Sequence, residues 1–533
     1  MPRSARPLTA GLLTGALACV LAATAAGAPA AQASTPDARI SARVGGSISL
    51  SPANYVGGQA VTFSGRLGVS GRRAIALQQF MGRPGDIWFP VKGYAGWTAS
   101  DGSFRVRVPA PDMWGIRYRV VSRGLASPSV LLHSKLQGAD LWVSGTDRDA
   151  PGQAGTPTAG VPFGVSVDTT PVIMGRRFGW GTPVFAGRGL TLQKRVGPTS
   201  WATVARTTET SDGHGYFTGL TEASAGTVVY RVRQEALLAG GSRVGWSTSY
   251  PTYLQVRGDG PTQAPPAPAT ARYDAWQPLQ ASGASLTPTM RTSFSTYRWG
   301  RKAFDFDWER GQSLTDAPGT GRGGYVEYSD GTGRAAKVNG MLGLDAKREV
   351  NVAAGDLGTT MATMTGNARP YGRWEVRFKT TATENTGRDY DLRAELVPSA
   401  SANYACGSRN ILLGQVRPNS RALTIGVKNG ARNWSATRPL TSTEGHPSLA
   451  VEVAPGHITW FYSGRPVCTV RTSLAVSRVP LTLRLSLVGR GTEEMNRATL
   501  GSDWQRGWPA TTRRQVLTGP ALRYGAQPNR CDS

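Results

Sequence analysis

The chain has 533 residues and a formal net charge of +26 at neutral pH; 39% of its residues are hydrophobic and 18% are charged. This composition excludes an intrinsically disordered protein, because it supplies enough apolar side chains for packed cores. The 67 glycines and 35 prolines, with no long amphipathic helical period, predict short strands and turns. A chain of this length predicts about three domains.

Residues 1–33 have the three parts of a secretory signal peptide. Two arginines precede a weakly apolar run over 8–26, and a small-residue stretch ends in Ala31-Gln32-Ala33. We expect cleavage after Ala33 and a protein that is secreted, either extracellular or associated with the cell surface. Lipidation of Cys19 is the alternative. No other run is long and apolar enough to span a bilayer, so we predict no transmembrane segment.

Residues 40–137 and 155–257 read as two copies of one unit. The first contains GRRAIALQQ, TASDGSFRVRVPAP and IRYRVVS, and the second contains GRGLTLQKR, ETSDGHGYF and VVYRVRQ. Alternating apolar and polar residues predict strands, and each Asp-Gly predicts a hairpin turn. About seven short strands in about 100 residues, with one Trp between two sheets, indicate an Ig-like β-sandwich. The copies resemble the Ig-like repeats common in secreted actinobacterial proteins, which implies a spacing or adhesive role.

The two copies align residue by residue. The matched positions are Leu77-Gln78 with Leu192-Gln193, Trp88 with Trp201, and Tyr118-Arg119-Val120 with Tyr230-Arg231-Val232. The remaining tryptophans of these units are Trp97, Trp114, Trp180 and Trp246. We interpret them as structural side chains of the sandwiches, with stacking on sugar rings as the alternative.

A Pro-rich linker, beginning GDGPTQAPPAPATA, is predicted over 258–290 and should be extended. It precedes a third unit over 293–523 and a tail over 524–533. Positive charge is spread through the chain without a polybasic block, so we expect no nucleic-acid partner. The positive field attracts polyanions, and the expected partners are polysaccharides or anionic cell-wall polymers. The alternative is that the arginines serve solubility.

Alternating runs through the third unit predict two stacked β-sheets. YGRWEVRFK (371–379) resembles the YGRFEARIK strand of glycoside hydrolase family 16, the laminarinase and lichenase relatives. LAVEVAPGHITWFYSGRPV (449–467) resembles the family's YAVEWTPDHIRWYVDGKLV hairpin, and Asp503-Trp504 resembles its closing DYVRVY strand. The resemblance implies a concanavalin-like jelly roll. The predicted fold class is therefore all-β: two Ig-like sandwiches followed by a jelly-roll sandwich.

The resemblance also implies a reactive strand, E-I-D-I-M-E, whose outer glutamates are the nucleophile and the acid/base. Retaining hydrolysis requires two carboxyl groups about 5 Å apart. NILLGQ (410–415) stands in that place, with Asn410 at the nucleophile, Leu412 at the Asp and Gln415 at the acid/base position. A register shifted by two residues uses Ser408, Asn410 and Leu413 instead. Neither register offers a carboxylate, and an amide cannot ionise or deliver a proton, so we predict no catalytic residue here.

The preceding run, YDLRAELVPS, places Asp391, Arg393 and Glu395 on one face by period two. One interpretation is a solvated face at a sheet edge. The other is a sugar-binding cleft lined by Asp391, Arg393, Glu395, Asn410 and Gln415, in which Asp391 and Glu395 form a substitute acid pair.

Three cysteines remain after signal cleavage: Cys406, Cys468 and Cys531. In an oxidising compartment an odd count means one disulfide and one free thiol, or three free thiols. The preferred pair is Cys406–Cys468, because both residues belong to the third unit whereas Cys531 is in the tail. No spacing of His, Cys and acidic residues indicates a metal site, and we expect no cofactor; a structural calcium is compatible with the sequence.

Three functions follow, in order of preference. The first is a non-catalytic polysaccharide-binding protein that uses a degenerate hydrolase fold. The second is a glycosidase that cleaves a β-glucan or an acidic polysaccharide with non-standard acids. The third is a basic structural or adhesion protein of the cell envelope.

Overall fold

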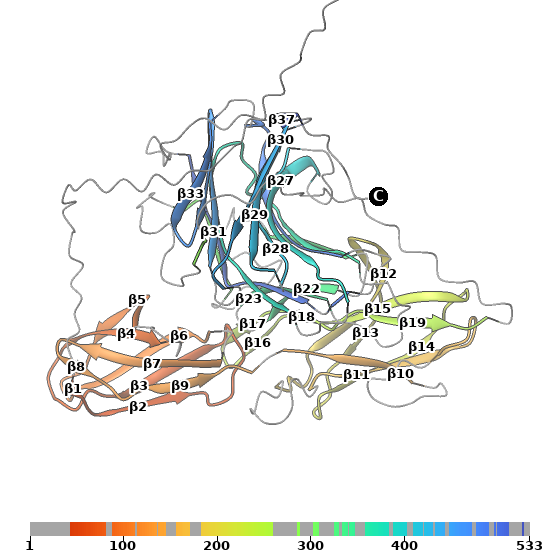
Figure 1. Ribbon diagram of the computed structural model, residues 1–533. Coiled ribbons are helices and arrows are strands. Elements are labelled where there is room, and N and C mark those ends of the chain that lie inside the picture. Colours follow the sequence, from red (N-terminus) through yellow and green to blue (C-terminus); the bar gives the residue numbers. More distant parts are fainter. Residues whose placement is uncertain are drawn as a thin grey trace, which may run out of the picture.

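In a computed structural model, regular structure consists almost entirely of β-strands (Figure 1). The structure describes residues 43–80, 88–111, 114–135, 137–144, 156–170, 183–258, 285–287, 302–308, 324–329, 333–338, 341–346, 358–382, 387–401, 409–418, 420–429, 432–442, 447–471, 476–489, 495–496, 498–510 and 525–526. Within these ranges the helical residues are those of the 3-10 turn η4, Ser399–Ser401, and Trp308. The prediction of an all-β chain is confirmed.

Among the described residues, no helix has the length and apolar character needed to cross a membrane.

The first sandwich packs two sheets over one apolar core. One sheet has the order β1-β8-β7-β4-β5, with β9 also paired to β7, and the other has the order β2-β3-β6. The strands are β1 (Arg43–Val44), β2 (Ser47–Ser51), β3 (Ala60–Arg66), β4 (Ala74–Phe80), β5 (Phe89–Trp97), β6 (Ser103–Pro109), β7 (Trp114–Ser122), β8 (Leu125–Ala126) and β9 (Val130–His133). Phe63, Leu77 and Val120 are fully buried between the sheets, so the core follows the alternation of the sequence.

The second sandwich has a separate core around Val165, Leu192 and Val232. Its main sheets have the orders β10-β11-β14 and β13-β12-β15-β18, with β19 paired to β15, and β16 and β17 form a small hairpin. The strands are β10 (Asp140–Ser144), β11 (Phe163–Asp168), β12 (Gly189–Gly197), β13 (Ser200–Thr208), β14 (His214–Leu220), β15 (Gly226–Gln234), β16 (Leu237–Ala239), β17 (Ser242–Val244), β18 (Ser247–Thr248) and β19 (Thr252–Val256).

The aligned positions of the two copies occupy equivalent places in the two sheets. Gln78 lies opposite Arg119 in the first sandwich, and Gln193 lies opposite Arg231 in the second. Turns are present at both Asp-Gly pairs, where Gly102 and Gly213 have the positive φ that glycine adopts without strain. The predicted hairpins are wrong, because each turn joins strands of different sheets, β5 to β6 and β13 to β14.

The expected position of the repeated Trp is wrong. Trp88 and Trp201 do not belong to the sandwich cores; each lies on the outer face of its sheet and stacks on an arginine. The guanidinium group covers the indole face, so the ring is shielded from water without entering the core. Trp97 also departs from the structural interpretation, because it is 61% exposed.

The side chain of Trp114 and the whole of Trp180 lie outside the described residues. Trp246 is half-buried and packs against the third domain, which agrees with a structural role.

Three short segments lie outside the sequence-based boundaries. β10 precedes residue 155 but pairs with β11, because the alternating DLWVS run buries Leu141 and Val143 in the second core. Leu286, within the predicted linker, bridges to Leu440 of the third domain. β37 (Gly525–Ala526), within the predicted tail, pairs with β30. Each segment joins the neighbouring sheet through backbone hydrogen bonds, which sequence pattern does not reveal.

The third domain contains three sheets. Their orders are β20-β36-β25-β31-β32-β33, β21-β24-β34-β27-β28-β29-β30-β37 and β22-β23-β35-β26. The strands are β20 (Phe304–Asp307), β21 (Tyr325–Ser329), β22 (Gly333–Val338), β23 (Met341–Ala346), β24 (Thr360–Met364), β25 (Gly372–Arg377), β26 (Lys379–Ala382), β27 (Asp391–Pro398), β28 (Ile411–Val416), β29 (Ala422–Asn429), β30 (Arg432–Pro439), β31 (Ser448–Ala454), β32 (His457–Tyr462), β33 (Arg465–Val470), β34 (Leu481–Val488), β35 (Ala498–Ser502) and β36 (Trp504–Pro509).

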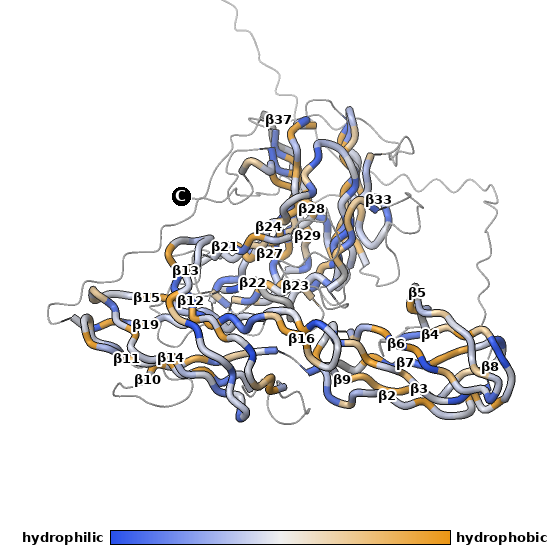
Figure 2. The backbone as a smooth tube through the Cα atoms, turned by 180° about the vertical axis from the view of Figure 1, so that it is seen from behind, coloured by the Kyte–Doolittle hydropathy of each residue, from blue (hydrophilic) through white to orange (hydrophobic). Residues whose placement is uncertain are grey.

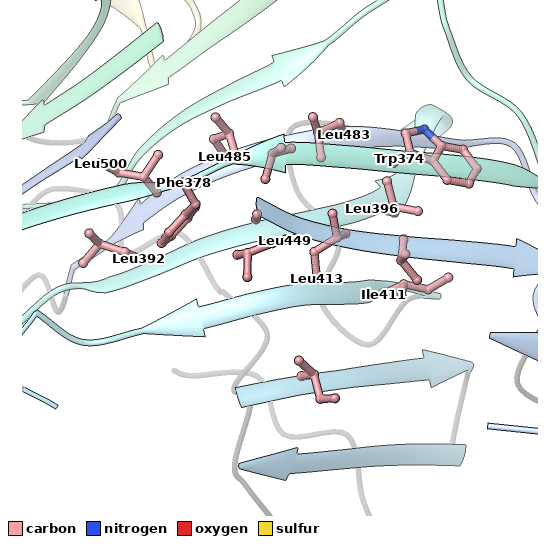
Figure 3. Packing of buried hydrophobic residues seen from close by; sticks show 14 of the residues in the cluster. Trp374, Phe378, Leu392, Leu396, Ile411, Leu413, Leu449, Leu483, Leu485 and Leu500 are labelled. Carbon is pink, nitrogen blue, oxygen red and sulfur yellow. The ribbon is translucent and has the colours of Figure 1, made fainter. Parts of the chain in front are cut away.

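The six- and eight-stranded sheets face each other across one large apolar core. Figure 3 shows Leu392 and Leu396 of β27, Leu413 of β28 and Leu485 of β34 turned toward this core, which they share with Trp374 of β25. The tube coloured by hydropathy alternates orange and blue along many strands (Figure 2), as expected when one face of a sheet is apolar. The eight-stranded sheet therefore has an inner face toward the core and an outer face turned away from it.

The second sandwich lies directly against the third domain, and the tube view places β12 and β13 beside β21 and β22 (Figure 2). Arg231 forms an ion pair with Glu327 at 2.6 Å. Tyr250 donates a hydrogen bond to Asp345, and the Arg334 guanidinium lies 3.5 Å from the Tyr250 ring centroid. These contacts connect the two domains through charged and aromatic side chains.

Candidate functional site

The outer face of the eight-stranded sheet carries the candidate site. Leu392, Ala394 and Leu396 of β27 point into the core, so Asp391, Arg393 and Glu395 point to the outer face. β27 is flanked by β34 and β28 and thus lies inside the sheet. The interpretation of this run as a solvated sheet edge is therefore wrong: Arg393 and Glu395 are both buried.

A β-bulge in β28 determines which residues of NILLGQ reach the outer face. Ala394 pairs with Gly414 and Glu395 pairs with Leu412, which leaves Leu413 as the extra residue. Leu413 points into the core, and a side chain at Gly414 would also point there, within 2.8 Å of Leu423 and Leu449. Two successive inward residues shift the later part of the strand by one position.

Because of this bulge, Leu412 and Gln415 share the outer face although three residues separate them. Asn410, two residues before Leu412, belongs to the same face by alternation and is fully buried. Without the bulge, alternation would place residues 410, 412 and 414 on the outer face. The extra residue Leu413 puts Gln415 there in place of residue 414. The shifted register would place the core residue Leu413 at a site position, and its Ser408 lies outside the described residues.

The bulge is held from the core side. Its shifted pairing frees the Leu412 carbonyl oxygen, which accepts a hydrogen bond of 2.8 Å from the indole Nε1 of Trp460 in β32. Trp460 is fully buried and packs on Trp434, with ring centroids 5.4 Å apart. The hairpin that resembles family 16 therefore fixes the backbone of the strand that carries the candidate site.

The two carboxylates of this face are each bound by arginine. Arg484 of β34 donates a hydrogen bond of 2.9 Å from Nη2 to Glu395 Oε2, and both side chains are buried. Asp391 accepts hydrogen bonds from Arg417 at 2.7 Å and from Arg393 at 3.3 Å. The hydrogen bond and charge of Asp391 raise the pKa of the Arg417 guanidinium. Both carboxylates are thus hydrogen-bonded to guanidinium groups.

Asp391 and Glu395 do not form an acid pair across a sugar. They are four residues apart on one strand, a separation of about 13 Å, whereas a retaining pair needs about 5 Å and an inverting pair about 6.5–9.5 Å. The Arg393 side chain stands between them on the same face. This arrangement provides neither a nucleophile nor a protonated acid at bonding distance from one glycosidic bond.

Polar side chains form a row across the outer face. Arg393 lies opposite Gln415 on one side and opposite Ser486 of β34 on the other. Gln415 in turn lies opposite Thr424 of β29, whose hydroxyl is 3.2 Å from that of Thr437. We call Thr437, Thr424, Gln415, Arg393, Ser486, Glu395 and Arg484 the outer row.

Several buried atoms of the outer row have no hydrogen-bond partner within the described part of the chain. They are Gln415 Oε1, Ser486 Oγ, and Nε and Nη1 of Arg484. These side chains are at most 7% exposed. Buried polar atoms in native proteins are normally paired, so a cluster of unsatisfied donors and acceptors indicates a place for hydroxyl-bearing groups or water.

Sequence pattern alone did not single out Arg484 and Ser486. They stand at period two in the run LTLRLSLV of β34, which was recognised only as a strand. The sequence does not show that β34 pairs with β27. This pairing brings Arg484 beside Glu395 and Ser486 beside Arg393.

Cys468 is buried in the core beside Trp460, its cross-strand neighbour. Its expected partner, Cys406, lies outside the described residues, as do Cys531 and the signal peptide. In the described ranges, no group of three or more His, Cys, Asp or Glu side chains is arranged to hold a metal ion.

No family model and no curated protein matches the sequence. Solved structures resemble part of it: a mutant endo-β-1,3(4)-glucanase from family GH16 has 11% identity and a TM-score of 0.32 and covers 45% of this chain and 100% of its own. The laminarinase catalytic domain from Thermotoga maritima has 15% identity and a TM-score of 0.27, covering 33% and 79%. The kappa-carrageenase from Zobellia galactanivorans has 14% identity and a TM-score of 0.25, covering 33% and 81%. These values assign no activity to the chain.

Proposed function

We propose that this chain is a secreted polysaccharide-binding protein, built on the family 16 glycosidase fold, that does not cleave its ligand. Support for the fold comes from the two motifs of the sequence. YGRWEVRFK supplies β25, and LAVEVAPGHITWFYSGRPV supplies β31, β32 and the first half of β33, which pair in order beside β25. The proposal therefore concerns the outer face of the opposite sheet, where the family's reactive strand belongs.

The bulge in β28 carries the proposal. It brings Asn410, Leu412 and Gln415 to one face with the spacing of the family's nucleophile, Asp and acid/base. The frame for the reaction is present, but the ionisable oxygens are replaced by amides and a leucine. The neighbouring carboxylates are engaged by Arg484, Arg393 and Arg417. A sugar held here meets hydrogen-bonding groups and no free acid.

The outer row suits a hydroxylated ligand because it offers both donors and acceptors. Gln415 Oε1 accepts, Arg484 Nη1 donates, and the Ser486 hydroxyl does either. Since these atoms are buried, a glycan must first displace the protein atoms that shield them from solvent. We therefore expect association slower than about 10⁵ M⁻¹s⁻¹, the lower end for rigid docking.

The test uses the purified full chain with laminarin, lichenan, agarose and hyaluronan. The expected result is retardation in gels that contain one of these polymers, retained at high salt, with no release of reducing ends. Release of reducing ends would overturn the non-catalytic proposal. Retardation that disappears at high salt would replace it with charge-driven adhesion to anionic wall polymers, because screening removes long-range attraction but not a fitted hydrogen-bonded contact.

A further inference from the structure

The second sandwich shows how its outer face binds a carboxylate. The Arg231 guanidinium stacks on Trp201 at 4.1 Å, and its Nε donates to Gln193 Oε1 at 2.9 Å. Its Nη1 then donates to the Glu327 carboxylate of the third domain at 2.6 Å. Trp201 and Gln193 fix the plane of the guanidinium, which leaves its terminal nitrogens for an anion.

The first sandwich repeats this arrangement with the same distances. Arg119 stacks on Trp88 at 4.1 Å, and its Nε donates to Gln78 Oε1 at 2.9 Å. Glu327 forms an ion pair with Arg231, but among the described residues no carboxylate forms one with Arg119. Burial lowers the pKa of Arg119, which indicates a guanidinium partly removed from water without a compensating anion.

The face around Arg119 is basic and aromatic. Arg117 and Arg119 of β7 share it with Trp97 of β5, which is 61% exposed and has the Arg72 guanidinium 5.3 Å from its ring. None of the strands of this sheet, β1, β4, β5, β7, β8 and β9, contains Asp or Glu. An anion approaching this face therefore meets no opposing charge from the sheet itself.

We propose that this face of the first sandwich is a second glycan site, which binds a polysaccharide that carries carboxylates, such as a polyuronate. Arg119 binds a carboxylate as Arg231 binds Glu327, and the apolar face of a sugar ring packs on Trp97. Trp97 of β5 lies opposite Ala74 of β4, and Arg119 of β7 lies opposite Gln78 on the other side of β4. Four residues along the strand and two strand spacings across it separate the two groups by about 16 Å. An extended chain of acidic sugars reaches both, whereas one carboxylate does not.

A polymer is favoured over an acidic protein by two observations. The exposed Trp97 offers a flat ring to a flat ligand, which gains by dispersion and burial of apolar area. The net charge of +26 gives long-range attraction to any polyanion, but the Arg119 site adds a directed, charge-assisted hydrogen bond. The site is separate from the outer row of the third domain and does not depend on it.

The experiment measures binding of the full chain to polygalacturonate and to its fully methyl-esterified form, which has the same backbone without the charge. We expect the acidic form to bind and the ester to bind at least tenfold more weakly. Arg119→Gln should weaken binding of the acidic form about tenfold or more, since it removes a hydrogen bond to a charged group. Trp97→Ala, which truncates an exposed side chain, should weaken binding of both forms.

The control is Arg105→Gln, which removes the same charge from the exposed face of β6 in the opposite sheet. It should change binding less than twofold. Equal losses in Arg105→Gln and Arg119→Gln would overturn the proposal in favour of general charge attraction. So would binding of poly-glutamate as tight as that of polygalacturonate and unaffected by Trp97→Ala. Thermal unfolding of each variant separates loss of the site from loss of the fold.

Discussion

The two faces of the eight-stranded sheet differ in what they bury. The inner face of β27 presents Leu392 and Leu396 to a continuous apolar core, and the outer face of the same strand presents Arg393 and Glu395. Both faces exclude water, but apolar burial stabilises the fold directly, whereas a buried ion pair gains little over apolar residues of the same size. The buried charged residues of the outer face therefore indicate a role other than stabilising the fold.

The largest effect is expected at the ion pair of the outer face. Glu395→Gln removes the anion and leaves Arg484 buried with its charge uncompensated, so the free energy of unfolding should fall by about 3–5 kcal/mol. Chemical denaturation checks this value. The matched control is Arg417→Gln, which removes a 47% exposed arginine from Asp391 while the buried Arg393 remains its partner; the expected loss there is about 1 kcal/mol.

The double variant Glu395→Leu with Arg484→Met sharpens the comparison further. Replacing both charges should return the stability to within about 1 kcal/mol of the parent or above it. A double variant as unstable as the single one would mean that the pair itself holds the sheet together, contrary to the contrast between the faces.

On the inner face, Leu485→Ala should lower the free energy of unfolding by about 2–5 kcal/mol, because it opens a cavity in the core. Leu485 is fully buried and lies opposite Ala362 and Ala394, which cannot fill the space. The decrease in the free energy of unfolding caused by Leu485→Ala should be the same at every pH between 5 and 9, since the substitution changes no charge. A loss below about 1 kcal/mol would contradict the assignment of Leu485 to the core.

Trp460→Phe tests the link between the faces. It removes the donor to the Leu412 carbonyl and should destabilise the protein by about 1–3 kcal/mol beyond the lost apolar area. Trp374→Phe is the control, because Trp374 is equally buried but its Nε1 has no hydrogen-bond partner in the described structure. Equal losses in the two variants would show that the bulge does not depend on Trp460.

The smallest effect on stability is expected for Gln415→Leu. Its Oε1 is buried without a partner, so the apolar replacement should leave the free energy of unfolding unchanged or raise it by up to about 1 kcal/mol. Retardation by the uncharged polymer that binds, among laminarin, lichenan and agarose, should nevertheless be lost. Gln255→Leu in the second sandwich, where the side chain is exposed, should keep it. Retained binding of that uncharged polymer in Gln415→Leu would exclude the outer row as the binding site.

Strand alternation allowed the fold and part of the outer row to be predicted. It placed Asp391, Arg393 and Glu395 on one face and located the hairpin that contains Trp460. It failed for Arg484 and Ser486, since period two gives the face of a residue within its own strand but not which strand lies beside it. It also assigned Trp88 and Trp201 to the cores, because hydrophobicity does not reveal that an arginine will stack on each ring.

By itself, the sequence determined the all-β class, the repeat and the absence of carboxylates from NILLGQ, because each depends on local pattern or on residue identity alone. Only the tertiary structure decided that a bulge brings Asn410, Leu412 and Gln415 to one face, that Arg484 neutralises Glu395, and that Arg231 meets Glu327 while Arg119 meets no described carboxylate. These are pairings between segments distant in the chain, and the register that creates them is set by the packing of whole sheets.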